Sequence, residues 1–70
     1  MSNKFITATG TVIEACGYGI FKVALESGHT ITCVISGKMR LHSIRVMVGD
    51  LVTLEMSPFD LTKGRIVKRN

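Results

Sequence analysis

The sequence is poor in the residue types that build catalytic centres, metal sites and disulfide frameworks. It has one proline, one tyrosine, three phenylalanines and two cysteines among 70 residues. Cys16 and Cys33 lack metal-ligand spacing, and two cysteines make no disulfide framework, so we expect both to be reduced. His29 and His42 stand apart from other ligand types, and no paired carboxylates, nucleophile-and-base pair or phosphate-binding glycine loop is present. The sequence therefore predicts no metal, no cofactor and no enzymatic activity.

Long hydrophobic runs are also missing. No stretch approaches the roughly 20 apolar residues that a membrane-spanning helix needs, and the N-terminus lacks the apolar run of a signal peptide. An apolar content of 46% argues against disorder. We expect a soluble, cytoplasmic monomer with one domain over residues 1–70, of which 1–4 are flexible. A domain of this size buries only about 60% of its unfolded surface, which leaves little room for a deep pocket.

Acidic residues are absent from two regions of a chain whose net charge is +4. Between Val34 and Gly49 every Lys, Arg, Asp or Glu is basic, and the same holds after Asp60. The basic residues of these two patches are Lys38, Arg40 and Arg45 in the first, and Lys63, Arg65, Lys68 and Arg69 in the second. Positive charge gathered on a small rigid body is typical of a polyanion-binding protein, and nucleic acid is the leading candidate.

Apolar residues alternate with polar ones in short segments that turn signals separate. Gly10 suits a bulge or bend, and Pro58 ends one segment because it cannot donate to a strand ladder. We predict strands at residues 5–15, 20–26, 29–35, 51–57 and 65–69, and a single helical turn within residues 37–45. Five strands with a helical insertion after the third is the order of the OB-fold, a partly open Greek-key barrel. An SH3-like barrel is the alternative.

Two aromatic residues in turns could stack on bases, as exposed aromatics of OB-folds do. Tyr18 lies between two glycines, and Phe59 follows Pro58. Small barrels also use aromatic side chains to close their ends, so both interpretations stay open. His42 would add positive charge below a pH of about 6.5. In the last strand, alternation predicts that Lys68 faces away from Arg65.

Several separated motifs closely resemble bacterial-type translation initiation factor one, in register over nearly the whole chain. They are Gly10-Thr11-Val12, Glu26-x-Gly28-His29, Ser36-Gly37-Lys38-Met39-Arg40, Ile44-Arg45, Gly49-Asp50, Pro58-Phe59-Asp60-Leu61 and Lys63-Gly64-Arg65-Ile66-Val67. The resemblance implies an OB-fold protein that binds ribosomal RNA and a ribosomal protein at the decoding (A) site of the small ribosomal subunit. It would keep the initiator tRNA out of that site and assist the other two initiation factors. The RNA-contacting positions that the resemblance implies are Lys38, Arg40, Arg45, Lys63, Arg65 and Arg69.

The chain departs from the family pattern at four places. Leu41-His42-Ser43 replaces a segment that often carries Lys or an aromatic, and Leu51 stands where Lys is common. Lys68 stands where an aromatic is common, and the loop 17–19 lacks the usual Pro-Asn. We hypothesise that Tyr18 and Lys68 partly compensate. A general single-stranded RNA binder or RNA chaperone, and a protein-interaction barrel, are the alternative functions.

Overall fold

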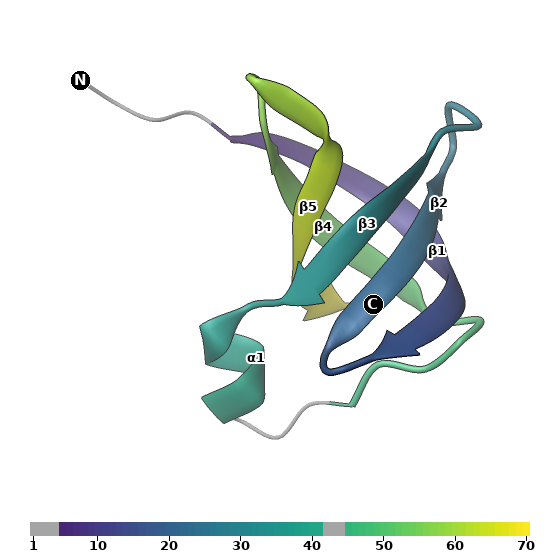
Figure 1. The fold of residues 1–70 in the computed structure, drawn as a ribbon, viewed down its shortest axis with the longest axis vertical. Helices are drawn as coiled ribbons and strands as arrows, with labels where there is room; N and C mark the ends of the chain where they lie inside the picture. Colours follow the sequence, from purple (N-terminus) through teal and green to yellow (C-terminus); the bar gives the residue numbers. More distant parts are fainter. Residues whose placement is uncertain (1–4, 42–44) are drawn as a thin grey trace.

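The protein folds as five strands and one short helix. The computed structural model describes residues 5–41 and 45–70, so the flexibility expected of residues 1–4 lies outside the described residues. In chain order the elements are β1 (Ile6–Gly17), β2 (Ile20–Leu25), β3 (Thr30–Ile35), α1 (Gly37–Leu41), β4 (Leu51–Ser57) and β5 (Asp60–Arg69). The strands wrap into a barrel, and α1 lies beyond one of its ends (Figure 1).

The barrel is closed, with the strand order β1-β2-β3-β5-β4. Neighbouring strands pair antiparallel, except that β3 and β5 run parallel. Because β4 lies on the far side of β5 from β3, the connection between β3 and β4 crosses the barrel end, and α1 forms part of that connection. This arrangement confirms the predicted all-β OB-fold with a helical turn between the third and fourth strands.

Inward-facing apolar side chains fill the barrel, as the two-residue period of the strands predicts. Leu25 and Ile35 are half-buried at the margin of this core. Cys33 is buried within it and Cys16 is exposed, and both are free thiols as predicted. Burial raises the pKa of the Cys33 thiol to about 11. The buried core residues are Val12, Phe21, Val23, Ile31, Cys33, Met39, Val46, Val52, Leu54, Met56 and Ile66.

Gly10 allows two strands to approach closely. Of the bulge or bend predicted there, the bulge is wrong. Both register shifts between β1 and β2 occur after Val12. A Cβ atom at Gly10 would lie 2.6 Å from Cγ1 of Val23 and 2.7 Å from the carbonyl oxygen of Ala24. Glycine is needed because the neighbouring strand β2 leaves no room for a side chain at this point.

The last strand begins five residues earlier than predicted. Ser57 pairs with Asp60 across the turn 58–59, so β4 and β5 form a hairpin. The Asp60 carboxylate accepts hydrogen bonds from the hydroxyl and the N–H of Thr62, at 2.6 and 3.1 Å. These two bonds, the hydroxyl bond foremost, hold the pKa of Asp60 below its ordinary value. Asp60 and Thr62 both lie at the start of β5.

Candidate nucleic-acid interface

Ser36 begins α1 and fixes how the helix sits on the barrel. Its Oγ accepts a hydrogen bond from the N–H of Met39 at 3.3 Å, and its carbonyl oxygen accepts from the N–H of Arg40 at 3.1 Å. This is an N-cap, which satisfies a helix donor that would otherwise lack a partner. Met39 is buried, so it anchors α1 in the core and leaves Arg40 exposed at the rim.

The predicted single helical turn within residues 37–45 is confirmed. It is α1, Gly37–Leu41, and Arg45 is not helical. Lys38 lies within α1. The predicted contact at His42 lies outside the described residues. Leu41, where the chain departs from the family pattern, is 81% exposed.

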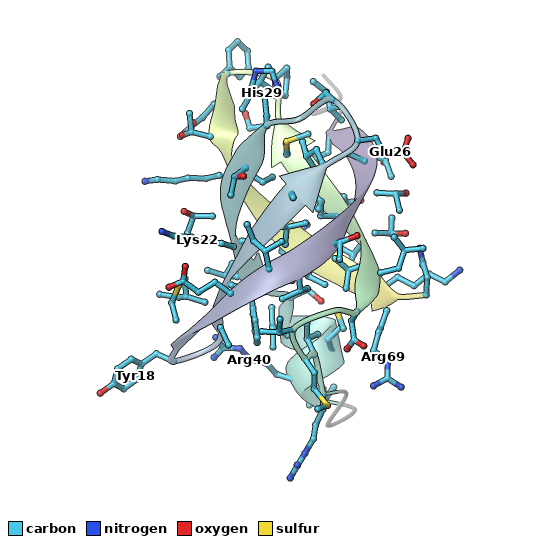
Figure 2. The ribbon with its side chains drawn as sticks, turned by 90° about the vertical axis from the view of Figure 1, so that its right-hand side faces the viewer. Tyr18, Lys22, Glu26, His29, Arg40 and Arg69 are labelled. Carbon is cyan, nitrogen blue, oxygen red and sulfur yellow. The ribbon has the colours of Figure 1, made fainter. Side chains whose placement is uncertain are left out.

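Arg40 reaches the loop that joins β1 to β2. A Cβ atom at Gly19 would lie 2.8 Å from Nη2 of Arg40, so the guanidinium packs against the backbone of this loop. Gly17, Tyr18 and Gly19 all have positive φ angles, of 86°, 57° and 74°. This left-handed path turns the Tyr18 side chain away from the barrel, where it is 97% exposed (Figure 2). The loop that carries the exposed Tyr18 therefore lies against the exposed Arg40 guanidinium at one end of the barrel.

The segment that carries Arg45 lies at the same end (Figure 1). The guanidinium of Arg69 donates a hydrogen bond from Nη1 to the carbonyl oxygen of Arg45, at 2.9 Å. Asp50 accepts from the N–H of Met47 through Oδ2 at 2.8 Å, and Val46 is buried. The backbone around the exposed Arg45 is thus held on both sides. We call Tyr18, Arg40, Arg45 and Arg69 the α1-end group.

A second set of cations follows the outer face of β5, and we call Lys63, Arg65 and Lys68 the β5 row. Arg65 pairs with Glu55 of β4, with 3.0 Å between Nη2 and Oε1. The same guanidinium lies over the ring of Phe5, with its central carbon 5.6 Å from the ring centroid. A shallow cleft of 220 Å³ adjoins this contact, and it is lined by Phe5, Glu55, Ser57, Lys63, Gly64 and Arg65.

Lys68 faces outward together with Arg65, so the predicted separation of these two side chains is wrong. Lys68 pairs with Thr53 and Arg65 pairs with Glu55, two residues further along β4 and therefore on the same face. The pairing skips Val67, which forms an irregularity in β5. A bulge of this kind adds one residue to a strand and reverses the alternation beyond it.

Phe59 belongs to neither group. It occupies the tip of the β4–β5 hairpin, which lies at the end of the barrel opposite α1 (Figure 1). Its side chain is 96% exposed, and its N–H donates to Oγ of Ser57 at 3.1 Å. The structure therefore brings Tyr18, but not Phe59, together with basic residues of the first patch.

The sequence showed no signal for three residues that orient the cations. Gly19 receives the Arg40 guanidinium, and Glu55 and Phe5 hold that of Arg65. Glu55 lies in an alternating strand and Phe5 at the start of another, where both types are ordinary. In the described part of the chain, no group of three His, Cys, Asp or Glu residues could hold a metal ion, and no helix there is long and apolar enough to cross a membrane.

Comparison with known proteins identifies the family. Residues 3–70 match the family model eIF-1a, described as translation initiation factor 1A / IF-1. The solution structure of the translation initiation factor IF-1 from the Wolbachia endosymbiont strain TRS of Brugia malayi is 38% identical, with a TM-score of 0.80 over 94% of this chain and 78% of that one.

Two larger proteins contain a similar barrel. YjeQ from Thermotoga maritima is 27% identical with a TM-score of 0.75, and YloQ, described as a circularly permuted GTPase, is 25% identical with a TM-score of 0.77. Each match covers 93% of this chain but 23% of the other protein, so the barrel forms only a part of those chains. The family model and the Wolbachia structure both match nearly the whole chain, and the chain therefore belongs to the translation initiation factor 1A / IF-1 family.

Proposed function

We propose that this initiation factor binds the decoding (A) site of the small ribosomal subunit through contacts to ribosomal RNA. Bound there, it blocks premature entry of tRNA and assists the other two initiation factors. It acts as a cytoplasmic, single-domain monomer without enzymatic activity, because filling a site and holding backbone phosphates require no chemical step. The proposal joins the family membership to the distribution of charge on the barrel.

The observation that carries the proposal is that Tyr18, Arg40 and the segment that carries Arg45 lie at the same end of the barrel. Arg40 and Arg45 are exposed; the Arg40 guanidinium packs against the backbone of Gly19, and the backbone of Arg45 accepts a hydrogen bond from Arg69. Guanidinium groups bind phosphates through two parallel hydrogen bonds, and a nearby exposed ring adds a surface for stacking. Rigid barrel ends of this kind suit a folded RNA of fixed shape.

The remaining proposed contacts extend this surface. Lys38 belongs to the same helix as Arg40, and Lys63, Arg65 and Lys68 continue the positive charge along β5. Arg69 contributes from the end of β5, next to Arg45. His42 and Phe59 are further proposed contacts, which rest on the sequence alone.

Binding of labelled protein to purified small ribosomal subunits across a salt series tests the proposal. We expect saturable, one-to-one binding that weakens with salt and is displaced by an antibiotic that occupies the decoding site. A plot of the logarithm of affinity against the logarithm of salt concentration falls steeply when many phosphates are contacted. Each lost phosphate contact makes this slope shallower by roughly 1. Arg40→Ala and Arg45→Ala should show this loss, and Lys22→Ala, which removes a cation outside both groups, should not.

The competition also separates the alternative functions. Binding that unstructured RNA removes as readily as the antibiotic does would indicate a general RNA-binding barrel. Weak, salt-insensitive binding to every RNA would indicate a protein-interaction barrel.

Stacking by Tyr18 is tested by Tyr18→Ala, which should cost about 1–3 kcal/mol of binding free energy. Phe59→Ala removes an equally exposed ring at the opposite end of the barrel and tests the proposed contact at Phe59 separately.

A further inference from the structure

Arg65 is already engaged on both sides within the folded protein. Its Nη2 atom lies 3.0 Å from Oε1 of Glu55, and its guanidinium lies over the ring of Phe5 at 5.6 Å. Arg65 and Glu55 are direct partners across the β4–β5 ladder, and their side chains are 49% and 31% exposed. The pair therefore sits on an open surface, in the middle of the β5 row, rather than inside the core.

These contacts restrict the Arg65 side chain but leave some of its N–H donors free to bind a phosphate. A guanidinium has five N–H donors in a fixed plane, and the bond to Glu55 occupies one edge of that plane. The Phe5 ring covers one face, which limits the rotation that a long side chain normally has. The remaining donors point in a direction that Glu55 and Phe5 together set. The Arg65 side chain therefore loses less conformational entropy when a phosphate binds to these donors.

Glu55 also changes the charge of the β5 row. Its carboxylate lies beside Arg65 on the outer face of the β4–β5 hairpin, whose neighbouring cations are Lys63 and Lys68. A phosphate that approaches the row at random meets this negative charge. A phosphate held on the far side of Arg65 by a rigid RNA avoids it. Discrimination of this kind is a difference between two affinities, and a repulsive group contributes to it as well as an attractive one.

We infer that Glu55, with Phe5, is a positioning residue that gives the β5 row a preference for RNA of fixed shape over flexible RNA. Glu55 orients the free donors of Arg65 and repels phosphates that arrive elsewhere. The inference rests on the proposed function, since it assigns a cause of selectivity to the same RNA-binding surface. It predicts that removing Glu55 strengthens binding to flexible RNA and fails to strengthen binding to the ribosomal subunit.

The test compares Glu55→Ala with Glu14→Ala, using purified small subunits and poly(U) RNA as probes at several salt concentrations. Glu14 is a matched control because it is also an acidic strand residue at the surface that is paired to a cation, Lys22, at 3.9 Å. Both variants gain one unit of net positive charge. We expect the ratio of subunit to poly(U) affinity to fall about fivefold in Glu55→Ala, the upper range for one surface ion pair. That ratio should stay constant in Glu14→Ala.

Two further variants show whether Glu55 acts through Arg65. In an Arg65→Gln background, Glu55→Ala should no longer change the ratio, because a residue that acts through a partner has no effect once the partner is gone. Phe5→Leu should lower the ratio by a smaller factor, since it removes the ring and keeps the ion pair. Equal thermal unfolding of these variants and the wild type would show that the changes do not come from lost folding.

The outcomes separate the inference from the proposed function. If Glu55→Ala and Glu14→Ala change both affinities by equal factors, or if neither variant changes the ratio, Glu55 is only a unit of negative charge and the inference fails alone. A ratio that falls equally with and without Arg65 would overturn it as well. If the wild type shows no saturable, antibiotic-displaced binding to subunits, the proposed function and the inference fall together.

Discussion

The guanidinium of Arg40 lies against the backbone of Gly19, so close that a Cβ atom at Gly19 would be 2.8 Å from Nη2. A segment of the first basic patch is thereby coupled to the loop between the first two strands, 21 positions earlier in the chain. Gly19 also accepts a hydrogen bond from the N–H of Ile35 through its carbonyl oxygen, at 3.2 Å. The loop and the start of the helical insertion therefore form one surface.

Gly19→Ala should weaken binding to the small subunit as well as destabilise the protein. The positive φ of Gly19 costs an L-residue roughly 1–2 kcal/mol, and the new methyl group displaces the Arg40 guanidinium. Gly17→Ala is the control, because Gly17 also has a positive φ but a Cβ atom there would meet nothing within 4 Å. Urea unfolding should show similar losses for both variants, and subunit binding should fall only for Gly19→Ala. Equal binding losses would mean that the Arg40 contact is unimportant.

Gly10→Ala should destabilise the barrel by about 1–3 kcal/mol, the usual cost of forcing extra volume into a packed site. Its Cβ atom would meet the carbonyl oxygen of Ala24 at 2.7 Å, and a backbone atom within a strand cannot move aside as a side chain can. Gly37→Ala, at the first residue of α1, has nothing within 4 Å and should not destabilise. The midpoint of urea unfolding measures both. A Gly10→Ala variant as stable as the wild type would contradict the proposed close approach.

Arg69→Gln should weaken subunit binding more than Lys68→Gln does. Both variants remove one positive charge at neighbouring positions of β5, but only Arg69 donates to the carbonyl oxygen of Arg45. Loss of that bond releases the segment that presents Arg45, so two contacts are affected by one substitution. We expect the salt dependence of binding to drop by more than 1 in logarithmic slope for Arg69→Gln and by roughly 1 at most for Lys68→Gln. Identical slopes would show that Arg69 acts by its charge alone.

Cys33 should make the protein less stable in alkaline solution. Burial raises the pKa of its thiol from 9.0 to about 11, so the unfolded chain releases this proton more readily than the folded chain. The stabilisation of the folded state that comes from the protonated Cys33 thiol is fully present below pH 9 and is lost as the pH rises towards 11. The melting temperature of the wild type should therefore fall relative to that of Cys33→Val over this range, and a constant difference would contradict the prediction. At a pH of about 8, an alkylating reagent should modify the exposed Cys16 and spare Cys33 until the protein unfolds.

The alternation of apolar and polar residues was enough to predict most of the barrel. Side chains two apart in a strand share a face, so the inward residues of β2, β3 and β4 followed from the sequence alone. The absence of acids around Arg40 and Arg45 likewise located the first basic patch. These features are local, because strand period and charge density depend only on residues near one another in the chain.

Register and bulges were decided by the tertiary structure. An unbroken ladder from the Ser57–Asp60 pair would place Glu55 opposite Thr62, yet an irregularity after Met56 brings Arg65 there instead. A second irregularity at Val67 turns Lys68 outward. The sequence by itself determined which residues carry the charge and which residues of β2, β3 and β4 fill the core, but not that Met39 and Val46 join it. Only the folded β4–β5 ladder decided which cation meets which partner, because each irregularity shifts the register in a way that the local pattern does not encode.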